Sequence, residues 1–226
     1  MITAQNVHRR FGKGAVTTHV LKGIDVSVDA GEYVAIMGKS GAGKSTLMYQ
    51  LSVLDTPDEG RVTVAGADVV GFTEREATAF RLQTLGYVFQ DYALVPDLTA
   101  EENVMLPLLM RGAVWTEARN IARESIDAVG MPGKYPNLPG ELSGGEQQRV
   151  AVARAIAGKP EILFADEPTA NLDTTSGTQV VDLITSLNHE HGLTIVMVTH
   201  EREYAMGCDR ILHMEDGRII EEEQLR

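Results

Sequence analysis

A glycine-rich segment that directly follows an apolar run constrains this chain more than any other part of its sequence. The segment is GKSGAGKSTL (residues 38–47), and the run before it is YVAIM (33–37). The segment matches the pattern G-x-x-x-x-G-K-[ST], in which glycines let backbone N–H groups converge on anionic oxygens. A helix starting near Lys44 would add its positive N-terminal dipole, and Lys44 itself would add a point charge. The segment therefore predicts a cradle for a bound triphosphate, with the Ser45 hydroxyl available to Mg²⁺.

This cradle supplies most of the candidate nucleotide contacts. Lys39 is ambiguous, because it either adds charge to the loop or is a solvated lysine. The candidate contacts in the segment are Gly38, Lys39, Ser40, Gly41, Ala42, Gly43, Lys44, Ser45 and Thr46.

Length and composition limit the classes of protein that the chain can belong to. Its 226 residues fit one large domain, or a core with one sizeable insertion. A formal net charge of -12 argues against nucleic acid as a partner, since proteins that neutralise many phosphates are usually basic. The single cysteine, Cys208, rules out an internal disulfide framework and is best explained as a small buried side chain. No apolar run approaches the roughly 18 residues of a membrane helix, so we expect no membrane span.

Alternating signals along the chain predict an α/β fold. The runs 33–37, 162–166 and 194–199 are continuously apolar, which is typical of strands buried on both faces of a parallel sheet. Residues 19–28 alternate apolar and polar side chains and indicate a half-buried antiparallel strand. Residues 210–222 predict a hairpin that turns at Asp216-Gly217.

The strand signal disappears between residues 92 and 158, where helical signals replace it. Thr99 to Glu102 form a capping-box pattern, and residues 116–130 carry apolar side chains at helical spacing, with Gly130 as a plausible end. We therefore predict one domain, 1–226. Residues 1–90 and 159–226 would form the α/β core with a β subdomain, and 91–158 an inserted helical subdomain.

Two acidic residues end the apolar run 162–166. Asp166 would reach the carboxyl edge of the sheet, where ligands of α/β proteins bind, and could hold Mg²⁺. Glu167 follows immediately and is placed to act as a general base on water. Without a phosphate cradle, two such acids would be ordinary surface residues at a strand end.

A second candidate anion site lies at LSGGEQQR, residues 142–149. Ser143 is a favoured helix N-cap, and Gly144 and Gly145 follow it at the start of a strongly helical stretch. An ordinary glycine-rich helix cap would look the same. The site would make sense if it met the nucleotide held by another copy of the chain.

These motifs, in this order, resemble those of the ATPase subunits of ABC transporters, and the resemblance covers essentially the whole chain. GKSGAGKS resembles Walker A, ILFADE resembles Walker B, and LSGGE resembles the signature motif. Gln90 resembles the lid glutamine, Asp173 the D-loop aspartate and His200 the switch histidine. Longer stretches, such as GYVFQDYALVPDLTAEENVMLPL, resemble the subgroup of macrolide exporters, lipoprotein-releasing complexes and the cell-division ABC complex.

The resemblance implies a P-loop NTPase core and an ATP-hydrolysing enzyme that uses ATP and Mg²⁺. Two head-to-tail copies would sandwich the nucleotides, so that Ser143, Gly144 and Gly145 of one copy meet the γ-phosphate held by Lys44 of the other. Glu167, His200 and Lys44 would be catalytic, and Ser45, Gln90 and Asp166 would hold the metal. Asp173 would communicate across the dimer. Ala42 stands where serine is common in the family, but that position mainly offers its backbone N–H.

The sequence indicates the adenine contact and the docking surface for a partner less clearly than it indicates the phosphate site. Phe11 stands where the family usually stacks adenine on an aromatic residue, often tyrosine, although a core phenylalanine would look similar. Residues 92–98 (YALVPDL) would either expose an apolar patch to a membrane partner or pack under the insertion.

The family implies an integral membrane permease as partner and a cytoplasmic location on the inner face of the cell membrane. Export or extraction of a lipid-like, peptide or drug substrate is the primary expectation. The alternative is a non-transport motor that signals through a membrane partner.

Overall fold

A four-stranded antiparallel sheet forms one side of the structure. The computed structural model describes residues 1–13 and 16–226. The strands of this sheet pair in the order β2-β1-β4-β5: β1 (Ile2–Lys13), β2 (Val16–Val28), β4 (Glu59–Val64) and β5 (Ala67–Asp68). The alternating stretch 19–28 lies in β2, which pairs with β1 in antiparallel register as predicted.

A six-stranded sheet forms the centre of the molecule, in the order β10-β9-β3-β8-β7-β6. Its strands are β3 (Tyr33–Gly38), β6 (Leu85–Val88), β7 (Ile162–Asp166), β8 (Thr194–Val198), β9 (Arg210–Glu215) and β10 (Arg218–Gln224). All neighbouring pairs are parallel except β9 and β10, which form the predicted hairpin around Asp216-Gly217. Every residue of β7 and β8 is buried, because helices and the small sheet cover both faces.

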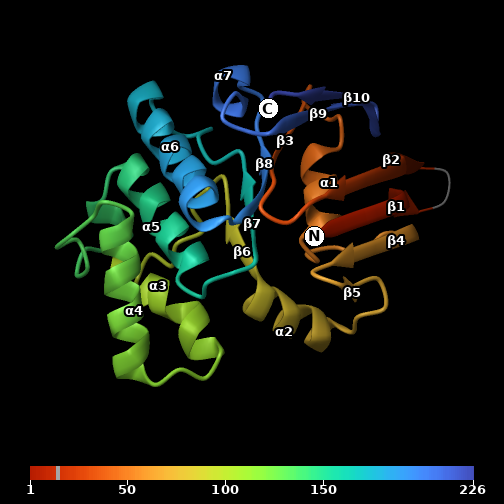
Figure 1. The fold of residues 1–226 in the computed structure, drawn as a ribbon. Helices are drawn as coiled ribbons and strands as arrows, with labels where there is room; N and C mark the ends of the chain where they lie inside the picture. The colour runs from red at the N-terminus through yellow and green to blue at the C-terminus, as the bar shows by residue number, and fades with distance from the viewer. Residues whose placement is uncertain (14–15) are drawn as a thin grey trace.

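Helix α1 (Lys44–Leu51) lies between the two sheets, as Figure 1 shows. Its Leu47, Met48 and Leu51 are buried in a cluster with side chains of both sheets, including Ile24 and Phe164. The opposite face of the large sheet is covered by α5 (Gly144–Ile156) and α6 (Thr174–His191). Two further helices are α2 (Glu74–Thr84), which precedes β6, and the short α7 (Arg202–Ala205), which follows β8. The predicted α/β fold, with a β subdomain and a helical insertion, is confirmed.

Residues 91–158 contain helices and no strand. They form α3 (Ala100–Met110), α4 (Trp115–Ala128), the 3-10 turn η1 (Pro139–Glu141) and α5. Thr99 makes the predicted capping box with Glu102, and Gly130 follows the end of α4 with a left-handed φ of 74°. The numerical division of the chain at residues 90/91 and 158/159 stays a prediction. In the part of the chain that the structure describes, no helix has the length and hydropathy to cross a bilayer.

The start of α5 is fixed by charge as well as by capping. The Glu146 carboxylate accepts from the Ser143 backbone N–H, and the Ser143 hydroxyl accepts from the Glu146 N–H. Lys134 Nζ lies 2.9 Å from the same carboxylate. The hydrogen bond from Lys134, followed by that from the Ser143 backbone, lowers the pKa of Glu146 from 4.5 to about 2.

This lowered pKa predicts an effect on acid unfolding. The folded pKa lies below the unfolded value, so Glu146 stabilises the fold above pH 4.5 and loses that contribution as the pH falls toward 2. Glu146→Gln should therefore flatten the decline in the free energy of unfolding between pH 4.5 and 2, measured by urea titration. Glu124→Gln, on the exposed face of α4, is the control that should keep the wild-type slope. Equal slopes for Glu146→Gln and wild type would contradict the prediction.

Candidate nucleotide site

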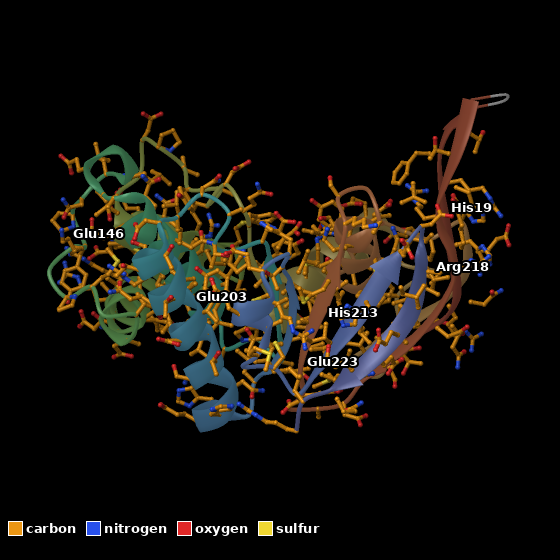
Figure 2. All side chains as sticks on the ribbon, turned by 90° about the horizontal axis from the view of Figure 1, so that it is seen from above. His19, Glu146, Glu203, His213, Arg218 and Glu223 are labelled. Carbon is orange, nitrogen blue, oxygen red and sulfur yellow. The ribbon has the colours of Figure 1, made fainter. Side chains whose placement is uncertain are left out.

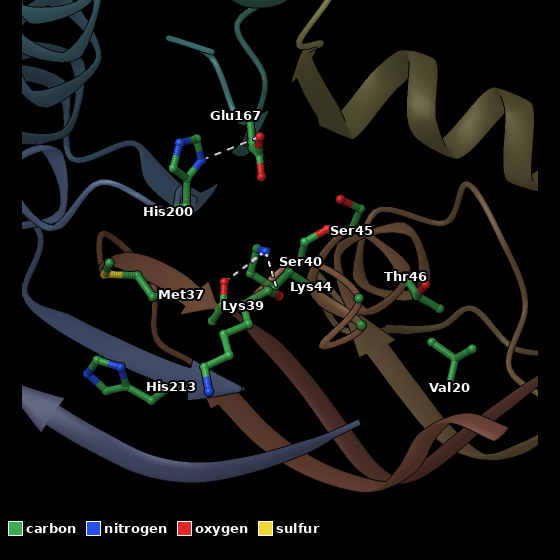
Figure 3. A pocket seen from close by; sticks show the side chains of 13 residues that line it. Val20, Met37, Lys39, Ser40, Lys44, Ser45, Thr46, Glu167, His200 and His213 are labelled. Atoms are coloured by element: carbon green, nitrogen blue, oxygen red, sulfur yellow. Dashed lines mark hydrogen bonds and ion pairs between the residues drawn. The ribbon is translucent and has the colours of Figure 1, made fainter. Parts of the chain in front are cut away.

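A cavity of about 970 Å³ opens at the carboxyl edge of the large sheet. Figure 3 shows that its walls come from segments far apart in the sequence, which the parallel strand order brings together. The lining residues are Val20, Met37, Gly38, Lys39, Ser40, Gly41, Gly43, Lys44, Ser45, Thr46, Glu167, His200 and His213.

The glycine-rich loop wraps around the amino end of α1. Gly38, Gly41 and Gly43 have φ values of 155°, 80° and 98°, a region that side-chain-bearing residues rarely adopt. Gly43 is the N-cap and has no side chain to bond the first N–H groups of α1, which leaves them for an anion. Lys44 Nζ donates to the carbonyl oxygens of Gly38 (3.0 Å) and Lys39 (3.3 Å), so its charge is held over the loop. This geometry suits a chain of phosphates.

The Ser45 hydroxyl donates to the Asp166 carboxylate across 3.1 Å. Burial raises the pKa of Asp166, and repulsion from Glu167 adds to the rise, while the hydrogen bond from Ser45 opposes it. A buried carboxylate beside a hydroxyl supplies the hard oxygen ligands that Mg²⁺ prefers. The two side chains therefore fit a magnesium ion that would also contact the phosphates.

Glu167 and His200 lie side by side on one wall of the cavity, opposite Lys44 and the glycine-rich loop (Figure 3). They follow the neighbouring parallel strands β7 and β8, in which Asp166 pairs with Val198, so both emerge at the same edge. Glu167 Oε2 lies 3.6 Å from His200 Nδ1. Glu167 has a left-handed φ of 44°, and its N–H donates to the Val198 carbonyl. Such a conformation costs on the order of 1–3 kcal/mol in a non-glycine residue and turns the side chain from the strand direction into the cavity.

Eight predicted site residues are not among the cavity-lining residues that the structure describes: Phe11, Ala42, Gln90, Ser143, Gly144, Gly145, Asp166 and Asp173. Asp166 is connected to the lining through its hydrogen bond from Ser45. Phe11 is 44% exposed on β1, with the Arg9 guanidinium 4.7 Å from the centre of its ring. The Ala42 N–H donates to the Lys39 carbonyl within the loop. Gln90 is exposed, and its carbonyl accepts from the Asn171 side chain at 3.2 Å.

The signature segment and the D-loop residue also lie apart from the cavity, packed against each other. Ser143 is exposed at the start of α5. A Cβ on Gly145 would approach the Ser176 side chain to 2.9 Å, so glycine is needed for this contact. Asp173 caps α6 by accepting from the Ser176 N–H (3.0 Å) and hydroxyl (2.7 Å); the backbone bond is the main cause of its lowered pKa. Within one copy, the second candidate anion site therefore does not reach the first.

Three lining residues were not predicted from the sequence: Val20, Met37 and His213. Val20 and Met37 belong to runs that also predict core packing, so their residue types give no signal. His213 is a polar residue between the apolar Leu212 and Met214, but placing it at the cavity requires knowing that β9 lies beside β3.

A sequence model described as ABC transporter matches residues 21–170. The chain belongs to the ABC transporter family.

Relatives from bacteria resemble this ABC protein along its whole length. It is 46% identical to the lipoprotein-releasing system ATP-binding protein LolD of Syntrophotalea carbinolica, with 97% of this chain and 96% of that protein covered. It is 44% identical to the macrolide export ATP-binding/permease protein MacB of Rhodopirellula baltica, of which it spans about a third (33%). A solved dimer of the ATP-binding cassette MJ0796, bound to ADP and Pi, superposes with a TM-score of 0.93 at 40% identity and covers 100% of this chain and 99% of that one.

These likenesses confirm the predicted family and its ATPase class. The chain is an ABC transporter ATP-binding subunit, and its relatives include the exporter and lipoprotein-release proteins that the sequence resembles. The roles of individual residues stay predictions.

The loop geometry predicts different costs for two glycine substitutions. A Cβ on Gly38 would lie 2.2 Å from the Met214 carbonyl oxygen, whereas one on Gly41 would meet nothing within 4 Å. We expect Gly41→Ala to lower the free energy of unfolding by about 1 kcal/mol, from backbone strain alone. Gly38→Ala should lower it by about 3 kcal/mol, because strain and overlap with backbone add. Urea unfolding of both variants measures the difference, and equal losses would show that the Met214 contact is unimportant.

Proposed function

We propose that two copies of this chain bind two ATP molecules between them, head to tail, and that ATP binding and hydrolysis drive a permease in the membrane. One observation carries the proposal. The cavity of a single copy collects the phosphate loop, Glu167 and His200, but not Ser143 and Gly145. One copy therefore supplies the proposed catalytic groups of the site. The second anion site, at Ser143 and Gly145, lies on another surface, where it could contact the nucleotide bound by a second copy.

The predicted site residues would have distinct roles. Lys44 and the N–H groups at the start of α1 would bind the β- and γ-phosphates. Ser45 and Asp166, with Gln90 reaching in from the lid, would hold Mg²⁺, which neutralises phosphate charge when bound. Glu167 would accept a proton from the attacking water, and His200 would contact the γ-phosphate and orient Glu167. Phe11 would stack on adenine, and Asp173 would contact the other copy.

The partner and location follow from the family. Relatives are named as an export ATP-binding/permease protein and as a lipoprotein-releasing system ATP-binding protein. We infer that this chain acts on the cytoplasmic face of the cell membrane, bound to an integral membrane permease that exports or extracts a lipid-like, peptide or drug substrate. The cassette residues would serve transmembrane signalling equally well, so the architecture of the permease decides between transport and signalling.

The segment 92–98 is a candidate docking surface with a defined backbone. Tyr92 and Ala93 have left-handed φ values of 60° and 49°, and the Arg154 guanidinium donates to both of their carbonyl oxygens. Leu94 is half-buried and packs against the core, whereas Val95 is 39% exposed. Leu94 therefore packs inward, whereas Val95 faces outward and is available to a partner; docking at this segment stays a proposal.

Glu167→Gln tests the catalytic proposal. The amide keeps the size of the side chain but cannot accept the proton, so ATPase turnover should fall by at least about 100-fold. The variant should also accumulate an ATP-bound dimer, detected by size-exclusion chromatography with ATP and Mg²⁺. Glu161→Gln, an exposed acid just before β7, is the matched control and should turn over normally. Wild-type turnover in Glu167→Gln would remove Glu167 as the base.

Val95→Asp tests the docking surface. A charge at this exposed position should weaken binding to the permease about tenfold, as loss of one apolar contact does at an interface. Val95→Asp is made in the Glu167→Gln chain, and the amount of membrane-spanning protein that co-purifies with it from detergent-solubilised native membranes is measured. Ile220→Asp, exposed on β10, is the control. Equal recovery of the same membrane protein by both variants would place docking elsewhere.

A further inference from the structure

His213 is the residue through which the C-terminal strand pair β9–β10 contributes to the wall of the nucleotide cavity. It lies on β9 beside Met37 of β3, its direct partner in the parallel register, and both line the cavity. Figure 2 shows His213 and Glu223 close together on the strand pair β9–β10. His213 Nε2 lies 3.1 Å from Glu223 Oε2. Glu221 is the residue directly opposite His213 in this pair, so Glu223 reaches it diagonally.

The Glu223 carboxylate also binds Arg202. Arg202 donates through both terminal nitrogens, to Oε2 at 2.9 Å and to Oε1 at 2.5 Å. This paired geometry is the strongest form of an arginine–carboxylate contact. The hydrogen bonds from Arg202 and then from His213 lower the pKa of Glu223 to about 2, so the carboxylate is ionised throughout the neutral range.

Arg202 begins α7 two residues after His200, so this ion pair acts on the segment that carries the candidate switch histidine. The segment is fixed upstream by the buried Thr199, whose N–H donates to the Ile36 carbonyl at 3.2 Å. The His200 side chain is 56% exposed, and its 3.6 Å contact with Glu167 is longer than a hydrogen bond. The backbone on either side therefore decides where the imidazole points, and downstream of His200 the contact of Arg202 with Glu223 contributes to that control.

We propose that Glu223 is a positioning residue for ATP hydrolysis. Its carboxylate connects Arg202, and therefore the segment that carries His200, to His213 in the cavity wall. The inference rests on the proposed role of His200 and adds β10, which lies outside the family's motifs, to the support of the site. A nucleotide that contacts His213 restrains the imidazole that contacts Glu223, and the same carboxylate restrains α7. Loss of Glu223 frees the His200 segment without removing any group that touches phosphate.

The test separates kcat from KM in steady-state ATPase measurements. Glu223→Gln and Arg202→Ala should each lower kcat about tenfold, because misplacement of a catalytic group slows turnover, with KM for ATP changed less than about twofold. His213→Ala removes part of the cavity wall and should raise KM. Glu221→Gln, the neighbouring acid directly opposite His213, is the matched control and should match wild type.

A charge reversal distinguishes positioning from general loss of structure. Arg202→Glu and Glu223→Arg should each lower kcat for ATP hydrolysis. The double variant should recover most of the wild-type kcat, because the ion pair is restored with its charges exchanged. A wild-type kcat in Glu223→Gln, or a double variant as slow as the single ones, would overturn the inference. Glu167→Gln in the same assay keeps the two proposals apart. If it is inactive while Glu223→Gln is normal, only this inference fails; if it turns over normally, the proposed catalytic site itself fails.

Discussion

Parallel pairing of β3, β8 and β7 is the constraint on which the rest of the structure depends. In a parallel sheet all carboxyl ends lie at one edge, so the segments after these strands must meet there. The phosphate loop, Glu167 and His200 are each the direct continuation of one of these buried strands. From Gly38 to His200 they span more than 150 positions of the sequence, yet the register of a few hydrogen-bonded strands places them around one cavity. Burial of the strands on both faces makes that register hard to shift.

The sequence predicts those parts of the site that one segment encodes by itself. The loop 38–47 carries its own conformation, because its glycines permit positive φ values and its lysine bonds back to the loop. The capping box at Thr99 and the N-cap at Ser143 are likewise local, and the sequence predicts both. Parts of the site that depend on which strands are neighbours could not be predicted from the sequence. His213, for example, lines the cavity because β9 lies beside β3. A short strand such as β6, four residues with only two of them buried, gives too weak a pattern to predict.

Local rules also fail where tertiary packing overrides them. Pro107 lies inside α3 although it cannot donate to the helix ladder. The helix persists because its neighbours Val104, Met105 and Leu108 are buried in the larger core cluster. Glu167 is the opposite case, an acid held in a left-handed conformation directly after a fully buried strand. The paired strands β7 and β8 supply the rigidity that such strain requires, and the Glu167 N–H gains a bond to Val198 as the chain turns.

The helix that starts at the signature segment is connected to the catalytic edge by one buried side chain. Gln148 of α5 is fully buried, and its amide donates to the Pro168 carbonyl at 2.8 Å and to the Phe89 carbonyl at 3.4 Å. Pro168 directly follows Glu167, and Phe89 directly precedes Gln90. A displacement of α5 must therefore either break these hydrogen bonds or move the two neighbouring backbone segments with it. If a second copy engages the amino end of α5 at Ser143 and Gly145, a displacement of α5 would reach, through Gln148, the backbone beside Glu167 and Gln90, the proposed general base and lid glutamine. Under the proposed mechanism, dimer assembly and alignment of the candidate catalytic residues would then be coupled, and we expect an isolated copy to hydrolyse ATP slowly.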